Sequence, residues 1–499
     1  MAQGVSAAQR RHALEPEPMG FAARQPFYVW IVVGTVCIGA FMGQLDASIA
    51  QLVLPTLEEV FHASLSSLEW VALAYLLTLA ALLAPVGRLA DLVGRKLLYT
   101  FGFTIFIIGS ALCGLSPTLS ILIGSRVLQA IGAALLQANS VAIITAAAGP
   151  KRRGKAIGIQ GTAQAVGLAI GPAVGGFLIT AFGWRWVFFI NVPAGIIGTV
   201  LGWLVLPRTQ DLGVSHQSFD FVGAGILAAA LVCIMLILSE GQTWGWVSLR
   251  ILMITVLAIV LIVVFLFYER RIENPVVDLK LFSSPAFSLG NLTGLLSYAV
   301  TFGTFLLIPF ELERVNHETP LQAGLVLTMV PVALAVIAPI SGSWSDRVGP
   351  RPPTVLGMSC AAVAFVALAL LAGDMNVILM APALALLGLG LGLFTPSNNS
   401  AIMGAAPPHR LGVASGILNM MRSLGTSTGV ALSGTTLSIA LAIFAGPQAT
   451  TLSAPVAAFS AALRVSLLLL AALSVAAALI SMLRQAAGGA RVDPSFLVE

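Results

Sequence analysis

Long apolar runs follow one another along almost the whole chain, and they constrain its fold more than any other feature. A helix that crosses a bilayer needs about 20 mainly apolar residues. Fourteen runs of suitable length can be counted among the 499 residues. Only 9% of the residues are charged, whereas soluble domains carry about 25%. The runs therefore predict an all-α integral membrane protein with 14 transmembrane helices.

The predicted spans form three sets along the chain. They are roughly 28–52, 67–86, 97–115, 119–147, 156–181 and 186–206; then 220–239 and 250–268; then 287–310, 322–345, 353–372, 377–402, 412–443 and 463–484. The predicted domains are a largely disordered cytoplasmic tail at 1–26, a six-helix bundle at 27–207, a linker with two inserted transmembrane helices at 208–285, a second six-helix bundle at 286–484 and a cytoplasmic tail at 485–499.

The distribution of Lys and Arg predicts the orientation. If the N-terminus is cytoplasmic, nineteen of the 25 basic residues fall in inner segments and four in outer ones. Inner loops of membrane proteins carry such an excess, so both termini should be cytoplasmic. The basic residues are dispersed over many loops, which argues against a nucleic-acid partner and for contact with the lipid bilayer.

A short pattern occurs twice, 255 positions apart, between apolar runs. It comprises Gly87, Asp91, Gly94 and Lys96 in the first copy and Gly342, Asp346, Gly349 and Arg351 in the second. Five glycines between Gly154 and Gly176 recur between Gly412 and Gly434 at a constant offset of 258. The chain is therefore predicted to contain two related six-helix halves. Duplicated membrane bundles usually move solutes by alternating access.

Each copy of the short pattern lies in a predicted inner loop. Glycines favour a tight reversal, and a carboxylate can face helix N-termini or a neighbouring arginine. One interpretation is a positive-inside loop with turn glycines. The other, which the duplication favours, is a latch between the halves. The latch residues would be Gly87, Asp91, Gly94, Arg95, Lys96, Asp346 and Arg351.

Charged side chains within spans are costly in lipid and are functional candidates by default. The predicted spans contain Asp46, Arg126 and Arg422. Because burial favours the neutral form of a carboxyl group, we expect Asp46 to load and release a proton as access alternates; a static polar contact is the alternative. The acids at predicted outer ends are Glu240, Glu311, Glu313 and Asp374.

Polar and aromatic residues in several spans are candidates for a substrate cavity between the halves, although helix–helix contacts explain each of them equally well. With one acid and two arginines in the core, we expect neutral, amphipathic or anionic compounds to be handled as readily as cations. The candidates are Gln51, Gln137, Asn139, Gln160, Gln164, Asn291, Phe302, Phe305, Asn398, Asn399, Asn419 and Arg422.

Several motifs resemble those of the major facilitator superfamily, in particular its fourteen-helix drug:proton antiporters. The segment from Gly87 to Lys96 resembles the signature loop of the superfamily. The segments that resemble antiporter motifs are Gly167-x-x-x-Gly171-Pro172-x-x-Gly175-Gly176, Leu45-Asp46-Ala47-Ser48-Ile49, Gly183-Trp184-Arg185-Trp186 and Asn191-Val192-Pro193. The chain departs from the pattern at Ser48, at Gln51 and between Pro309 and Glu313, which leaves the substrate range open.

The resemblance implies the major facilitator fold and proton-coupled efflux of small amphipathic compounds, such as drugs, antibiotics or toxic metabolites, by rocker-switch antiport. Arg126 resembles the fourth-helix arginine of these antiporters and would favour release of the Asp46 proton; a structural ion pair is the alternative. Gly167, Gly171, Pro172, Gly175 and Gly176 would form a bendable interface that favours outward release, or else ordinary small-residue packing.

A dedicated exporter or flippase of a lipid-like or endogenous metabolite is the alternative function. An enzyme is not expected, because the sequence shows no His/Asp or Cys/His cluster at a membrane face. The five histidines lie outside the predicted spans, so no metal site is expected, and a phosphate-binding Gly-x-x-x-x-Gly-Lys-Ser/Thr loop is absent. We expect a monomer in a bacterial cytoplasmic (inner) membrane, driven by protons without a cofactor.

Overall fold

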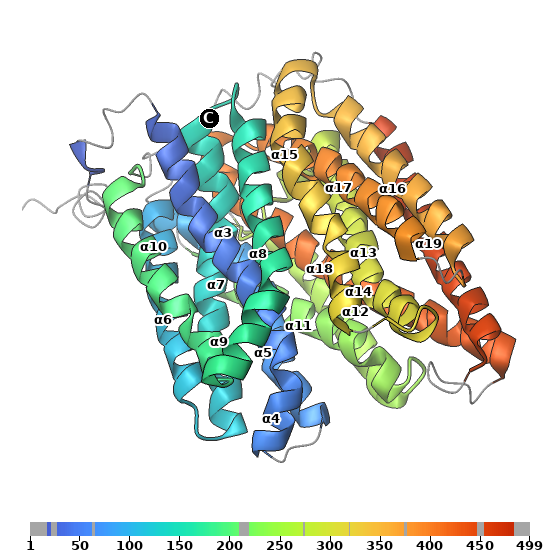
Figure 1. Cartoon of the computed structure of the whole chain (residues 1–499). Coiled ribbons are helices and arrows are strands. Elements are labelled where there is room, and N and C mark those ends of the chain that lie inside the picture. The colour runs from blue at the N-terminus through green and yellow to red at the C-terminus, as the bar shows by residue number, and fades with distance from the viewer. Residues whose placement is uncertain are drawn as a thin grey trace, which may run out of the picture. The chain divides into compact units, whose positions relative to one another are not determined.

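Every regular element that the structure describes is a helix (Figure 1). The computed structural model describes residues 17–20, 27–61, 65–208, 219–272, 275–318, 320–373, 377–446 and 454–483. The predicted tails at 1–26 and 485–499 lie almost entirely outside these ranges. The all-α membrane fold is thus the one that the apolar runs predict.

The helices of the first part of the chain are α3 (Tyr28–Leu52), α4 (Leu54–Phe61), α5 (Leu65–Val93), α6 (Arg95–Leu115), α7 (Leu119–Ala148), α8 (Arg153–Phe182), α9 (Trp186–Phe189), α10 (Asn191–Val205), α11 (Phe221–Trp244) and α12 (Leu249–Glu269). The second part forms η2 (Leu279–Ser283), α13 (Pro285–Arg314), α14 (Pro320–Leu327), α15 (Met329–Val348), α16 (Arg351–Leu371), α17 (Val377–Ala405), η3 (Pro408–Arg410), α18 (Leu411–Ala445) and α19 (Val456–Met482).

Thirteen segments of the described residues are long and apolar enough to cross a membrane. Each corresponds to one of the fourteen predicted spans. The remaining predicted span, 156–181, lies in α8, which is a continuous helix of 30 residues. The chain is therefore a multi-pass membrane protein, while the count of 14 spans and the cytoplasmic position of both termini stay predictions.

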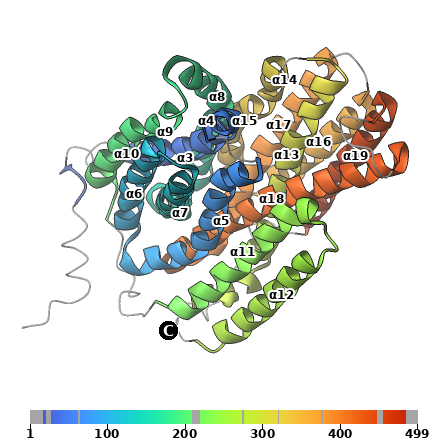
Figure 2. The same ribbon diagram turned by 90° about the horizontal axis from the view of Figure 1, so that it is seen from below.

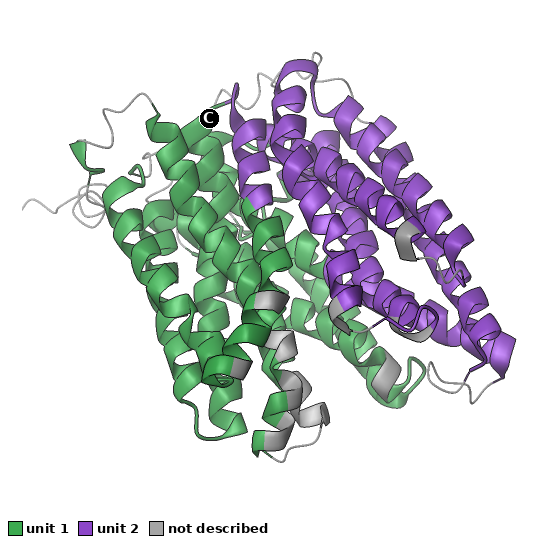
Figure 3. Cartoon of the chain, in the orientation of Figure 1, with its two compact units in different colours: residues 1–149, 163–280, 406–424 green, residues 150–162, 281–405, 425–499 purple. Residues whose placement is uncertain are grey.

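The chain forms two compact units, and each unit draws on both halves of the sequence (Figure 3). Unit 1 contains residues 1–149, 163–280 and 406–424, and unit 2 contains 150–162, 281–405 and 425–499. Two long helices are divided between the units: α8 begins in unit 2 and continues in unit 1, whereas α18 begins in unit 1 and continues in unit 2. The predicted domain boundaries stay a prediction.

The inserted pair, α11 and α12, belongs to unit 1. Figure 2 shows α11 between α5 and α12, and the contacts agree with this order. Local sequence explains where the two helices begin, because Asp220 and Ser248 accept hydrogen bonds from backbone N–H groups of the first turns of α11 and α12. Such N-caps satisfy donors that the helix itself leaves unpaired.

Glycines allow α6 and α7 to pack closely within unit 1. A Cβ atom at Gly109 of α6 would lie 2.5 Å from Cα of Gln129 on α7, and one at Gly132 of α7 would clash with the backbone of Phe106. Small residues allow helix backbones to approach in this way. The same contact fixes the position of Gln129.

The short repeated pattern is more helical than the sequence suggests. α5 continues through Gly87 and Asp91 to Val93, so that only Gly94, with φ 126°, separates it from α6. In the second copy, Gly349 with φ 86° follows α15 directly. The prediction of a loop from Gly87 to Lys96 was therefore wrong in extent. A single glycine with positive φ reverses the chain, and the leucine and alanine residues before it favour helix.

The glycine contact between α6 and α7 predicts a strong stability effect. Gly132→Val should destabilise the protein by about 1–3 kcal/mol or more, because overpacking forces the two backbones apart. The measurement is the thermal unfolding midpoint of the purified protein in detergent. Gly124→Val on the same helix is the matched control, because a Cβ atom there meets no atom within 4 Å. Equal midpoints for the two variants would contradict the role of the glycine contact.

Candidate functional site

Asp46 is buried in unit 1, with 2% of its surface exposed, at the point where three polar side chains converge. Its Oδ2 accepts a hydrogen bond from Nη1 of Arg126 at 2.8 Å. Its Oδ1 accepts from Nε2 of Gln129 at 2.9 Å and from Nδ2 of Asn191 at 2.9 Å. A carboxylate only accepts hydrogen bonds and can satisfy all three donors, and its charge balances that of Arg126.

Arg126 of α7 connects α3 to α5. Its Nε donates to the carbonyl oxygen of Val71 at 3.1 Å, and Nη1 also donates to Oε1 of Gln129 at 2.6 Å. The guanidinium carbon lies 4.3 Å from the centre of the Tyr75 ring, a cation–π contact. The predicted proton-coupling residues are therefore in direct contact, while their role in coupling stays a prediction.

Three further residues complete this site and were not among the predicted site residues: Gln129, Ser110 and Asn191. Gln129 lies one turn after Arg126 and therefore on the same helix face, and its Nε2 also donates to Oγ of Ser110 at 2.6 Å. Asn191 belongs to the Asn191-Val192-Pro193 segment. Helical spacing from Arg126 could have identified Gln129, whereas the contact of Asn191 depends on how α10 packs against α3.

The first latch carboxylate lies at the N-terminus of α18. Asp91 accepts hydrogen bonds from the backbone N–H groups of Gly412 at 2.9 Å and Val413 at 3.0 Å. Arg95 donates from Nη2 to Asp91 at 2.8 Å and to the carbonyl oxygen of Pro408 at 3.0 Å. A carboxylate at a helix N-terminus satisfies free N–H groups and favours the helix dipole.

Glycines make this approach possible. A Cβ atom at Gly87 would clash with the carbonyl oxygen of Gly412, and one at Gly412 would clash with the Asp91 carboxylate. Gly94 supplies the reversal between α5 and α6. Lys96 is buried, with 1% of its surface exposed.

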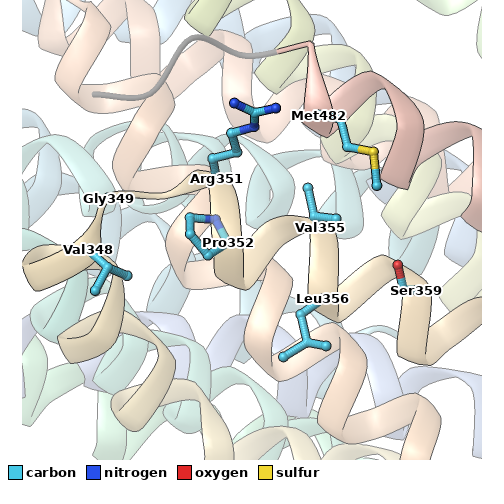
Figure 4. A pocket seen from close by; sticks show the side chains of 8 residues that line it. All are labelled: Val348, Gly349, Arg351, Pro352, Val355, Leu356, Ser359 and Met482. Carbon is cyan, nitrogen blue, oxygen red and sulfur yellow. The ribbon is translucent and has the colours of Figure 1, made fainter. Parts of the chain in front are cut away.

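The second latch carboxylate repeats this geometry in unit 2. Asp346 accepts from the backbone N–H groups of Gly154 at 3.0 Å and Lys155 at 3.1 Å, at the start of α8. A Cβ atom at Gly342 would clash with the carbonyl oxygen of Gly154. Arg351 is not part of this contact. It is exposed and lines a cavity of about 620 Å³ together with Val355 and Met482, among others (Figure 4).

The segment after α12 brings further charge to the first latch. Asp278 lies 3.8 Å from Arg410, in η3 directly before α18. Glu269, at the end of α12, holds the same segment by accepting a hydrogen bond from the backbone N–H of Val277 at 2.6 Å. The fully buried Arg88 lies on α5 in the electrostatic field of these groups. The inserted pair of helices is therefore connected to the start of α18.

The glycines of α8 pack against α3 close to Asp46. A Cβ atom at Gly167 would lie 2.6 Å from the carbonyl oxygen of Phe41, and one at Gly171 would clash with the side chain of Ser48. Ser48 donates to the carbonyl oxygen of Leu168 at 3.2 Å. Of the remaining predicted residues of this motif, Gly175 is buried, Gly176 is exposed, and the Pro172 side chain lies outside the described residues.

Three predicted cavity residues meet in unit 1. Gln137 of α7 accepts at Oε1 from Nη2 of Arg422 at 3.3 Å, and its carbonyl oxygen accepts from Nδ2 of Asn419 at 2.9 Å. Asn139 instead donates to Leu135 of its own helix at 2.7 Å. Gln164 is half-buried, and the side chain of Gln51 lies outside the described residues.

Other predicted cavity residues lie in unit 2 and make local contacts. Asn398 donates to the carbonyl oxygen of Gly290 at 3.1 Å, whereas Asn291 donates to Phe287 of its own helix at 2.9 Å. The Phe302 and Phe305 rings lie 6.0 Å apart. Gln160 is buried, with 3% of its surface exposed, and Asn399 is half-buried. A role in substrate binding stays a prediction for all of these residues.

An all-helical multi-pass fold with a duplicated carboxylate contact at helix N-termini defines a membrane transporter. Residues 36–430 match the family model described as Major Facilitator Superfamily. This chain belongs to the major facilitator superfamily, whose members carry small molecules across membranes. The resemblance that the motifs indicated is thus confirmed at the level of the superfamily.

The relatives include proteins that are named for different transported compounds. The chain is 37% identical over 403 residues to the riboflavin transporter RibZ of Clostridioides difficile (strain 630), covering 81% of this chain and 87% of that one. It is 31% identical to the multidrug resistance protein Stp of Mycobacterium tuberculosis (strain CDC 1551 / Oshkosh), covering 80% and 74%. It is also 31% identical to the tetracenomycin C resistance and export protein of Streptomyces glaucescens, covering 81% and 75%.

Solved structures support the fold. The human organic anion transporter MFSD10 superposes with a TM-score of 0.67 over 92% of this chain and all of that one, at 15% sequence identity. The proton:xylose symporter XylE superposes with a TM-score of 0.64 over 91% of this chain and 94% of that one, at 14% identity. At these identities the likeness concerns the fold alone.

The contact of Asp91 with α18 leads to a prediction about the accessibility of this helix. Asp91→Asn should loosen the start of α18, because it weakens two hydrogen bonds and removes an ion pair. In a variant without the four native cysteines, Ser415→Cys, which is buried on α18, should then react with a maleimide about 5-fold faster or more, the effect of roughly 1 kcal/mol.

The control for this prediction is Glu17→Gln. Glu17 pairs with Arg208 on the surface, where 76% of its side chain is exposed, and such pairs contribute little. The maleimide reaction should keep its rate in this variant. An unchanged rate in Asp91→Asn as well would show that the carboxylate does not hold the helix.

Proposed function

We propose that this transporter exports small amphipathic compounds, such as drugs, antibiotics or toxic metabolites, in exchange for protons. The observation that supports this best is the buried contact between Asp46 and Arg126, because a buried carboxyl group beside a permanent positive charge is suited to bind and release a proton. The export and resistance proteins among the relatives favour the direction of transport. The proposal includes a monomer in a bacterial cytoplasmic membrane, with both termini inside and no cofactor.

The proposed cycle begins with Asp46 ionised and bound to Arg126. A proton from the outer side binds a carboxylate oxygen of Asp46, which then no longer attracts the guanidinium group. Arg126 keeps its contacts with Val71 and Tyr75, so α3 can move relative to α5 and α7. When access changes to the inner side, Arg126 approaches Asp46 again and the proton leaves to the cytoplasm.

In the proposed cycle, the two latches separate two stable arrangements of the helices, one with the latch contacts made and one with them broken. Asp91 holds the start of α18 and Asp346 holds the start of α8, each by two backbone N–H groups. A contact of this kind is either made or broken, because a carboxylate must meet the first turn of the helix directly. We propose that proton binding at Asp46 and substrate binding shift the balance between the arrangements in which these contacts are made and broken.

Replacement of the proton site tests the proposal directly. Asp46→Asn should abolish proton-driven efflux, by 100-fold or more where detection allows, because the amide keeps the shape of the side chain but cannot exchange a proton. The measurement is ethidium transport into inverted proteoliposomes with an imposed proton gradient. Glu318→Gln, a neutralised carboxylate outside the helices, is the control and should transport normally. Normal gradient-driven transport by Asp46→Asn would rule out this coupling site.

A flavin is a second candidate substrate, favoured by the 37% identity to a riboflavin transporter. The multidrug proposal expects saturable ethidium transport that riboflavin does not inhibit. The measurement compares riboflavin fluorescence and ethidium fluorescence in the same proteoliposomes. Saturable riboflavin transport without ethidium transport would replace the multidrug proposal with a dedicated flavin carrier, and transbilayer movement of a labelled lipid alone would favour the flippase alternative.

A further inference from the structure

Glu311 is a buried acid that the proposed cycle does not use. It lies near the end of α13 in unit 2, with none of its surface exposed. The sequence places it at the predicted outer end of a span, but α13 continues to Arg314, and the apolar span reaches Leu312. By the sequence repeat, α13 is the first helix of the second half, as α3 is the first helix of the first half. Among the described side chains, each of these two helices therefore carries one buried carboxyl group.

The contacts of Glu311 are few. Its Oε1 accepts a hydrogen bond from the backbone N–H of Gly373 at 2.6 Å, in the turn that follows α16. Its Oε2 has no hydrogen-bond partner within the described ranges. A buried polar atom without a partner is uncommon in a folded protein and needs an explanation.

The nearest charge does not neutralise Glu311 by direct contact. Arg464 of α19 directs Nε and Nη2 to the carbonyl oxygen of Ala372, at 3.1 Å and 2.7 Å. Among the residues that the structure describes, it is the one charged group whose field reaches Glu311, and the two side chains form no ion pair within 4.0 Å. The side chains of Glu313, Arg314 and Asp374 lie outside the described residues.

Asp46 and Glu311 therefore differ in the hydrogen bonds and charges that a bound proton would affect. Asp46 accepts three side-chain hydrogen bonds and contacts an arginine, so a proton there removes the charge that binds a counter-ion. Among the described side chains, Glu311 has one donor and no counter-ion in contact, and a buried carboxylate in such surroundings is poorly stabilised. A proton on Oε2 of Glu311 would neutralise the group without breaking any hydrogen bond that the structure shows.

We infer that Glu311 is a second proton-binding carboxyl group, which holds its proton on Oε2 while the Ala372–Gly373 turn covers it and releases the proton when water reaches this end of α13. The inference rests on the proposed proton-coupled function and deepens it. Each transport cycle would then involve one exchangeable proton in each half of the chain.

The test compares Glu311→Gln with Glu311→Ala in the full-length protein in liposomes. The glutamine keeps an acceptor for Gly373 and the shape of a protonated glutamate, so a purely structural role predicts normal behaviour for it and loss of thermal stability for the alanine variant only. A proton-binding role predicts that Glu311→Gln binds about one proton fewer than the wild type in a titration from mildly acidic to mildly alkaline pH. Infrared difference spectra over the same range should lack one carboxyl C=O band.

The outcomes separate this inference from the proposed function. A proton count and infrared spectrum of Glu311→Gln equal to those of the wild type overturn the inference, while loss of transport in Asp46→Asn would still support proton coupling. Loss of one proton in Glu311→Gln together with normal transport by Asp46→Asn would overturn the Asp46 assignment but leave Glu311 as a proton site.

Discussion

The buried contact between Asp46 and Arg126 is the interaction on which the arrangement of unit 1 depends. Removing one partner of such a pair costs about 3–5 kcal/mol, because the other charge is left without compensation. The helices around the pair must therefore supply polar groups at fixed positions. α5 presents the carbonyl oxygen of Val71, α7 presents Gln129, and α10 presents Asn191. These requirements fix the rotation of three helices relative to α3.

The duplicated latches show how an internal repeat becomes a repeated contact. Asp91 meets Gly412 and Asp346 meets Gly154, so the carboxylate of one repeated pattern binds the glycine of the other repeated set. Each contact joins residues from opposite halves of the sequence within one compact unit. This explains why α8 and α18 are each divided between the two units. The carboxylate needs both N–H groups of a first helical turn, and a glycine there gives it room.

The sequence predicts the fold well because lipid allows few alternatives. Apolar runs must be helices, and thirteen of them are long enough in the described residues. Asp46 and Arg126 could be predicted because a charge within an apolar run is rare. Gln129 and Asn191 could not be predicted as site residues in the same way. An amide side chain in a helix can form hydrogen bonds with many partners, and its contacts depend on how the helices pack. The extent of the helical segment before Gly94 depends on one backbone angle, which the sequence pattern does not define.

The two halves of the sequence have similar latch carboxylates at helix N-termini, but the surroundings of their buried acids differ. The latch carboxylates Asp91 and Asp346 each accept two backbone N–H groups in the same geometry. Asp46 accepts from three side chains, one of which is its counter-ion. Among the described residues, Glu311 accepts from one backbone N–H, and the nearby arginine donates to a backbone carbonyl. Equal acids in equal surroundings would bind and release protons together. In the proposed cycle, acids in unequal surroundings would respond to different movements, so that one half would release a proton while the other still holds its own.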